Sequence, residues 1–290
     1  MTNIEFLAAL KTELEEFEKA VSTDEKEWII KGFIDIYKNI YSISIDTKIV
    51  SKVLELLLFP LLVQFADKHK LKTELSPQQN FYPDITFIDD NANKFALDIK
   101  TTYRVDGKKV NGMTLGAFTG YFRKRDSAKN TRYPYSQYSG HFVLGIIYSQ
   151  CEDVGDERKK FSLEDLQKIP SVIKDFKFFA QPKFRLATDR PGSGNTKNIG
   201  SVVKIDDLIN GTGPFNDLGE EIFDDFWIYY LTKDMAKALE ITRPYTNLKT
   251  YRAYKEKGNE ILEANKEKIE NMETEAEPEN GDNGENGDTE

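Results

Sequence analysis

Apolar residues recur every three or four positions along the N-terminal part of the chain, which is the spacing of one helix face. This pattern predicts helices over residues 2–20 and 24–40. A third apolar run begins after Asp46, a favourable N-cap residue, and predicts a helix that ends at His69. Pro60 lies inside that run, and we expect it to kink the helix.

The spacing then changes from the period of a helix to that of a strand. Residues 85–88 are rich in β-branched and aromatic side chains, residues 89–93 are typical of a turn, and residues 94–101 alternate between apolar and polar positions. This pattern predicts an antiparallel hairpin. Later in the chain, the same reasoning predicts a helix around 115–125, strands at 141–149 and 177–179, a loop over 192–200 and a helix over 218–239.

Composition separates a globular body from an acidic tail. Residues 1–259 mix both patterns and predict one α/β domain, with a mixed central β-sheet, flanking helices and an N-terminal helical part. Residues 260–290 hold twelve Asp and Glu against two Lys and predict a disordered tail. The chain carries −9 in total and this segment −10, so the body carries +1, and its charge does not exclude a DNA partner.

The scarcity of cysteine and histidine excludes several chemistries. The chain has one cysteine, Cys151, and two histidines, His69 and His141, so an internal disulfide or a zinc cluster of these ligands is impossible. Carboxylates and lysines must therefore carry any catalysis. The longest apolar stretch, residues 56–63, is shorter than the roughly 20 residues of a membrane helix, and no signal peptide pattern opens the chain. We expect a soluble cytoplasmic protein with no membrane partner.

The predicted hairpin carries the residues best suited to catalysis. Asp98 and Lys100 are two positions apart on a strand, so their side chains project from the same face. Asp84 opens the partner strand, and the turn can bring it near Asp98. Two close carboxylates repel unless a cation lies between them, and Mg²⁺ prefers oxygen ligands. A neighbouring lysine can stabilise charge on a phosphate, which suits phosphodiester hydrolysis. The alternative is an ordinary ion pair on an exposed strand face.

Other polar segments have both a functional and a plain structural interpretation. Residues 192–200 combine three glycines with Ser, Asn and Thr side chains, which suits contact with a base edge. They could instead bind a nucleotide phosphate, although the GxxxxGK[ST] pattern is absent, or form a polar surface loop. Basic residues within 123–132 offer phosphate contacts or form a solvated helix end. Glu55, a charge inside the third apolar run, is either a site residue or a solvated residue at the helix rim.

These motifs lie within longer blocks that resemble one enzyme family. The blocks read SIDTKIVSKVLELL, QQNFYPDITF, ALDIKTTY, TLGAFTGYFR, YPYSQYSGHFVLGIIY, GSGNTKNIGS and NLKTYRAYKEKG. In order and spacing, over residues 40–258, they are similar to the EcoRV-like type II restriction endonucleases of the PD-(D/E)xK superfamily. The resemblance implies a restriction-endonuclease-like core with an N-terminal dimerisation part, a homodimer, a Mg²⁺ cofactor and cleavage of double-stranded DNA. It also implies GATATC as the first target to test, a blunt cut that leaves 5′-phosphates, and pairing with a cognate DNA methyltransferase.

The resemblance also implies roles for individual residues. Asp84 and Asp98 would bind Mg²⁺, Lys100 would be the catalytic lysine, and Glu55 would be a third acidic group near the metal. The residues implied to contact DNA are Gln79 and Asn80 at the minor groove, Gly192, Ser193, Gly194, Asn195, Thr196, Lys197 and Asn198 in a recognition loop at the major groove, Thr101, Thr102, Thr119 and Lys129 at the phosphate backbone, and Arg252 in the C-terminal segment. Lys197 stands where the family carries a threonine.

Two other classes of protein remain open from the residues alone. One is a DNA-binding protein that does not cleave, built on a nuclease fold, and the intact Asp84, Asp98 and Lys100 argue against it. The other is a nucleotide-binding protein that uses residues 192–200. It predicts affinity for ATP and no effect on DNA.

Overall fold

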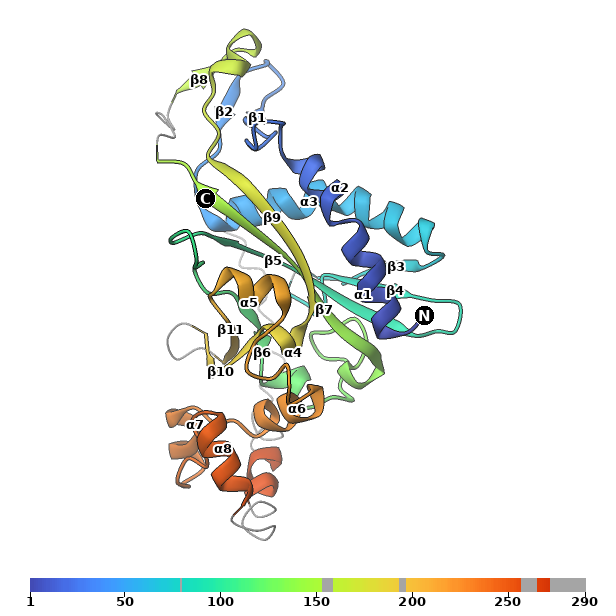
Figure 1. Ribbon diagram of the computed structural model, residues 1–290, viewed down its shortest axis with the longest axis vertical. Coiled ribbons are helices and arrows are strands. Elements are labelled where there is room, and N and C mark those ends of the chain that lie inside the picture. Colours follow the sequence, from blue (N-terminus) through green and yellow to red (C-terminus); the bar gives the residue numbers. More distant parts are fainter. Residues whose placement is uncertain (79, 153–158, 193–196, 257–264, 272–290) are drawn as a thin grey trace, which may run out of the picture.

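A five-stranded mixed sheet forms the centre of the computed structural model, which describes residues 1–78, 80–152, 159–192, 197–256 and 265–271 (Figure 1). Its strands, in spatial order, are β3 (Lys72–Leu75), β4 (Ile85–Ile88), β5 (Lys94–Tyr103), β7 (Tyr138–Gln150) and β9 (Ile173–Pro182). The β5–β7 pair is parallel, and the other pairs are antiparallel. The predicted α/β class and the hairpin are confirmed, and the strands predicted at 141–149 and 177–179 lie within β7 and β9.

Three helices pack on one face of this sheet, namely α1 (Asn3–Thr12), α2 (Leu14–Val21) and α3 (Thr47–Lys68) (Figure 1). The ring of Phe6 in α1 stacks on Phe95 of β5, with 4.6 Å between their centroids. The single helix predicted over residues 2–20 is in fact two, because the chain bends at Glu13, which ends α1 and begins α2.

Helix α3 begins as predicted and belongs to the core. The side chain of Asp46 accepts hydrogen bonds from the backbone N–H groups of Lys48 (2.8 Å) and Ile49 (3.3 Å). By length and composition the helix could cross a membrane, since its most apolar window has a mean hydropathy of 1.9. Every fourth residue from Val50 to Leu62 is fully buried, however, which is the pattern of a helix that packs one face against a sheet.

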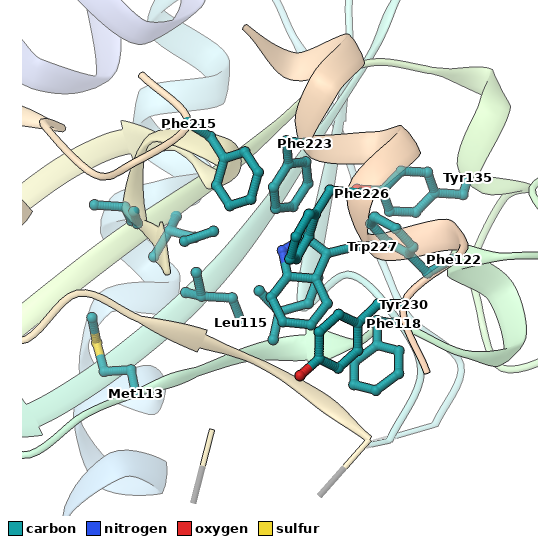
Figure 2. Close-up of a cluster of buried hydrophobic side chains, with 14 of the residues drawn as sticks. Met113, Leu115, Phe118, Phe122, Tyr135, Phe215, Phe223, Phe226, Trp227 and Tyr230 are labelled. Carbon is teal, nitrogen blue, oxygen red and sulfur yellow. The ribbon is translucent and has the colours of Figure 1, made fainter. Parts of the chain in front are cut away.

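A second core, rich in aromatic side chains, lies on the opposite face of the central sheet. It is covered by a small antiparallel sheet and several short helices, which are β6 (Thr114–Ala117), β10 (Ala187–Pro191), β11 (Asn198–Ser201), α4 (Lys183–Leu186), α5 (Ile205–Asn210), α6 (Glu220–Ile228), α7 (Lys233–Ala238) and α8 (Leu248–Lys255). Figure 2 shows Phe223, Phe226 and Trp227 of α6 packed among the rings of Phe118 and Phe122.

The prediction of a helix over residues 24–40 is wrong. The chain there forms β1 (Gly32–Ile34) and β2 (Ile40–Ser42), which pair with β8 (Lys160–Phe161) in a third sheet. The turn between β1 and β2 is held by Asp35, whose carboxylate accepts hydrogen bonds from the backbone N–H groups of Tyr37 and Asn39 (both 2.9 Å). Local side-chain bonds of this kind compete with a helix and favour a hairpin.

Three further boundaries differ from the predictions. The segment 115–125 is strand β6 followed by a short 3₁₀ turn, because Gly116 (φ 93°) and Gly120 (φ 58°) adopt left-handed backbone angles that a helix cannot contain. The helix predicted over 218–239 is split into α6 and α7, and the Thr232 side chain caps the second. Residues 265–271, expected within a disordered tail, form a helix. The other residues of that predicted tail lie outside the described residues.

Candidate active site

The backbone of the β4–β5 hairpin brings the two predicted motifs together. Ile85 pairs with Leu97, which places Asp84 opposite Asp98. The backbone N–H of Asp84 donates to Asp98 Oδ1 (3.4 Å), and the backbone N–H of Ile99 donates to Asp84 Oδ2 (2.7 Å). Each carboxylate therefore accepts a hydrogen bond from the backbone of the other segment, and the two carboxylates lie close together.

Burial and charge make this place electrostatically unusual. The Lys100 Nζ atom lies 3.2 Å from Asp98 Oδ2, and Asp98 is only 5% exposed. Burial, with the added charge of Asp98, raises the pKa of Asp84 to about 6, although the charge of Lys100 opposes the shift. Burial acts to lower the pKa of Lys100, but the carboxylates of Asp98 and Asp84 outweigh it and raise that pKa, so Lys100 stays protonated.

The two carboxylates fit a hard divalent cation. Asp98, which is buried, and Asp84, which is half-buried, carry two negative charges against one lysine, and this leaves an excess of negative charge. Among the described residues, no group of three His, Cys, Asp or Glu side chains converges as a metal-binding cluster. Mg²⁺ is commonly bound through one or two carboxylates while it keeps several water molecules, so a pair is sufficient for it.

Glu55 lies near the pair but is not joined to it. Its Oε1 atom forms an ion pair with Lys52 Nζ (2.7 Å), one turn earlier in α3. Its charge still contributes to raising the pKa values of Asp84 and Lys100, so it lies within electrostatic range of both. Glu55, implied as a third acidic group near the metal, thus lies beside the carboxylate pair and does not form a cluster of three with it.

An open cleft of about 300 Å³ leads to the lysine. Glu55 lines it from α3, and Lys100, Thr101 and Thr102 line it from β5. The hydroxyl groups of Ser51 and Thr101 are 2.6 Å apart, and this hydrogen bond joins α3 to β5. The cleft therefore gathers one acidic residue, the lysine and two of the threonines expected at a phosphate backbone.

The predicted recognition loop is described only at its two ends. Ser193, Gly194, Asn195 and Thr196 lie outside the described residues, as does Gln79 of the other predicted loop. The backbone N–H of Gly192 donates to the carbonyl oxygen of Asn198 (2.9 Å), which closes the β10–β11 hairpin at the base of the loop. The carbonyl oxygen of Lys197 accepts from the backbone N–H of Phe118 (2.9 Å), which attaches the loop to the end of β6.

The other residues expected at DNA occupy separate surface positions. Asn80, Lys129 and Arg252 are exposed, and Thr119 is half-buried beside the 3₁₀ turn that follows β6. Arg252 belongs to α8. The first turn of α8 contacts the β10–β11 hairpin, because the backbone N–H of Leu248 donates to the carboxylate of Asp189 in β10 (3.0 Å).

Three residues of the basic segment 123–132 have internal partners. Arg123 donates to the carbonyl oxygens of Ile228 (2.8 Å) and Tyr230 (2.5 Å), Arg125 forms an ion pair with Asp224 (2.5 Å), and Arg132 forms one with Glu74 (2.7 Å). These contacts fix the segment to the protein body. These three arginines are therefore less available for phosphate contacts than the sequence suggested. They do not form a solvated helix end either.

Sequence reasoning missed a buried polar group beneath the site. The hydroxyl of Tyr82 lies 2.8 Å from His141 Nδ1, and His141 stacks on Tyr135 at 3.7 Å between ring centroids. Lys183 is buried beside these rings. A lysine within the apolar segment FKFFAQPKFRLA was the only available signal, and a lone lysine carries little information before its neighbours are known.

Comparison with known proteins agrees with this geometry. A family model described as restriction endonuclease EcoRV matches residues 24–256. The type II restriction enzyme EcoRV of Escherichia coli is 33% identical over 236 residues, which cover 80% of this chain and 93% of that protein. The matched region includes the hairpin, the cleft and the described ends of the recognition loop.

Proposed function

The chain belongs to the EcoRV restriction endonuclease family, and from that premise we propose that it hydrolyses double-stranded DNA at a short palindrome with Mg²⁺ as its cofactor. Family membership makes it a type II site-specific deoxyribonuclease; the cofactor, the target and the cut position are what we add. One observation carries the proposal. Asp84, which is half-buried, and Asp98, which is buried, form a pair in which each carboxylate accepts a hydrogen bond from the backbone of the other segment, with Lys100 beside them.

We assign the catalytic roles from this geometry. Asp84 and Asp98 would hold Mg²⁺, which when bound would activate a water molecule and stabilise charge on the scissile phosphate. Lys100 would supply a fixed positive charge next to the phosphate, because its ammonium is already oriented by Asp98. Glu55 would act from the rim of the cleft, where its charge influences the pair without joining it.

We assign DNA contacts by position. Residues 192–198 would read the major groove, since Gly192 and Asn198 meet at the end of the β10–β11 hairpin, to which α8, with Arg252, is attached. Residues 79–80 would lie along the minor groove. The phosphate backbone would pass Thr101 and Thr102 in the cleft, with Thr119 and Lys129 as outlying contacts. Because residues 192–200 resemble the recognition loop of this family, GATATC with a blunt cut and 5′-phosphate ends is the first target to test.

A homodimer would match a palindromic target, because both have two-fold symmetry. The third sheet offers a surface for it at one end of the molecule, which Figure 1 shows beyond the central sheet. Phe33, Ile34, Ile36 and Tyr37 are 51%, 58%, 87% and 80% exposed there, and we name these four residues the β1–β2 apolar face. An exposed apolar surface of this kind typically marks a protein interface. We expect the dimer to act in the cytoplasm, beside a DNA methyltransferase that protects the same sequence.

The direct test is cleavage of a plasmid with one GATATC site, incubated with Mg²⁺ or with a chelator. We expect linear DNA with Mg²⁺ only, and none from a matched plasmid in which that site carries a single base change. Sequencing the ends would identify the cut position. Binding without any nicking would instead support a DNA-binding protein that does not cleave, and ATP binding without an effect on DNA would support a nucleotide-binding protein.

A further inference from the structure

Lys183 is a buried cation that none of the assigned roles uses. It begins α4, directly after β9, and is only 2% exposed. Its Nζ atom forms no hydrogen bond with any residue that the structure describes. Burial disfavours an ammonium group without a hydrogen-bonding partner and lowers the pKa of Lys183 to about 8, so the group still carries its charge at pH 7.

Aromatic rings surround this ammonium. Its Nζ atom lies 4.8 Å from the ring centroid of Tyr82, 5.4 Å from Tyr135 and 5.5 Å from Phe122, distances at which a cation is attracted to a ring. Figure 2 shows Phe122 and Tyr135 side by side at the edge of the aromatic core. We name Tyr82, Tyr135 and Phe122 the lysine cage.

The cage lies between the catalytic hairpin and the strand that supports the recognition loop. Tyr82 is two residues before Asp84. On the other side, a Cβ atom added to Gly116 of β6 would lie only 3.4 Å from Lys183 Nζ, so the backbone of β6 passes directly over the ammonium. The charge of Lys183 also interacts with Asp98 and, on α6, with Asp224.

Asp224 does not neutralise Lys183, because it already has a partner. Its carboxylate pairs with Arg125 at 2.5 Å, whereas Asp98 has Lys100 at 3.2 Å and a second carboxylate opposite it. Glu220 of α6 also interacts with Lys183, so the ammonium has acidic groups both on α6 and at the Asp84–Asp98 pair, and only the Asp84–Asp98 pair is proposed to bind a metal. A cation held by uncharged rings can act on that pair without forming a bond that would compete with a metal.

We propose that Lys183 is a positioning residue of the active site, whose caged ammonium acts from beneath on the Asp84–Asp98 pair and holds Tyr82 against β6. The inference rests on the proposed function, because it assumes that the pair binds Mg²⁺. Two effects follow from it. The positive charge weakens the attraction of the pair for a divalent cation, and it adds to the charge that stabilises the phosphate during cleavage.

The test is Lys183→Met, which removes the charge and keeps a side chain that packs well against aromatic rings. We expect the Mg²⁺ concentration at half-maximal cleavage to fall about three- to tenfold and kcat to fall as well, with no loss of thermal stability. Calorimetric titration of the free protein with Ca²⁺ should show tighter binding by a similar factor. Loss of packing alone would lower kcat and thermal stability together, without tighter binding of the cation.

Three controls complete the experiment. Lys177→Met removes an exposed lysine from β9, the strand that directly precedes Lys183, and should change nothing. Lys183→Arg keeps the charge and should retain the wild-type Mg²⁺ midpoint. Lys183→Gln replaces Lys183→Met if the latter does not fold, with the same expected outcomes.

The outcomes separate the two levels of the proposal. An unchanged or raised Mg²⁺ midpoint in the uncharged variants, or a lowered midpoint in Lys183→Arg, would overturn the role of Lys183. If the wild-type protein showed no cleavage that depends on Mg²⁺, the proposed function itself would fail. Calcium binding would still report on the charge of Lys183 in that case.

Discussion

The carboxylate of Asp84 accepts a hydrogen bond from the backbone N–H of Ile99 (2.7 Å), the residue that separates Asp98 from Lys100. This hydrogen bond holds Asp84 against the middle of the segment that carries Asp98 and Lys100. Because the donor is part of the β5 backbone, Asp84 cannot rotate away without losing a partner in a buried site. The proposed catalytic groups are thus held in position before any substrate binds, which is a requirement for electrostatic catalysis.

Replacement of Asp98 by alanine should abolish cleavage and spare binding. The change removes one of the two proposed metal ligands and the partner of Lys100, so we expect kcat to fall by about a thousandfold or more. Affinity for GATATC duplex in Ca²⁺ should stay close to wild type, as measured by gel shift. Asp90→Ala, in the exposed turn between β4 and β5, is the matched control and should cleave normally. Full cleavage by Asp98→Ala would show that Asp98 is not a required metal ligand.

The pH dependence of cleavage should reflect Asp84. Burial above all raises the pKa of this carboxyl group to about 6, so it is protonated below that pH and deprotonated above it. Only the deprotonated form binds a cation well, and cleavage should therefore fall as the pH drops below about 6. Since protons and Mg²⁺ compete for the site, a higher Mg²⁺ concentration should move this acid limb to lower pH. Rates measured over pH at two Mg²⁺ concentrations would test it, and an acid limb that does not move with Mg²⁺ would count against it.

Glu55→Gln should weaken cleavage less than Asp98→Ala. Glu55 is paired with Lys52 and lies outside the carboxylate pair, so it influences the metal as an outer group. Loss of such groups typically costs about ten- to a hundredfold in activity or metal affinity. Single-turnover rates of the two variants, side by side, would rank them. Equal losses would mean that Glu55 moves to become a true ligand when the metal and DNA are bound.

The hairpin could be predicted from sequence because its determinants are local. Alternating residues define β5, and Asp89 closes the turn through hydrogen bonds from the backbone N–H groups of Asn91 (3.0 Å) and Asn93 (2.9 Å). Once that hairpin is drawn, Asp84 and Asp98 must meet. The hairpin and the proposed catalytic pair therefore followed from one short segment, and the resemblance to a known family supplied the remaining site assignments.

Other features could not be predicted because they depend on distant parts of the chain. The prediction of a helix over 24–40 failed because Phe33 of β1 and Ile36 of the turn that follows it are exposed and do not face a core. Lys183 was overlooked because its neighbours come from distant parts of the chain. Its cage is assembled from residues 82, 122 and 135, and no spacing within one element reveals that they meet.

The β1–β2 apolar face should hold two copies of the chain together. Placing a charge there, as in Ile36→Asp combined with Phe33→Asp, would bury unpaired carboxylates in the interface. We expect this variant to sediment as a monomer and to lose double-strand cleavage, while its thermal stability changes little because both side chains are exposed. Ile4→Asp, at an 81% exposed position of α1, is the control and should remain dimeric. A double variant that stays dimeric would exclude this face as the interface.

The acidic C-terminal segment should weaken nonspecific DNA binding. Residues 272–290 contain eight Asp and Glu and no Lys or Arg, so a chain ending at Asn271 loses eight negative charges. We expect that chain to bind random duplex DNA several-fold more tightly at low salt, with a difference that disappears at high salt. The end point matters because Ile269 is buried, and a chain ending at Gly258 would also lose part of the aromatic core and melt at lower temperature. A full-length chain with the same eight residues changed to Asn and Gln separates charge from length. Equal affinity of this variant and the wild type for random DNA at low salt would rule out a role for the segment's charge.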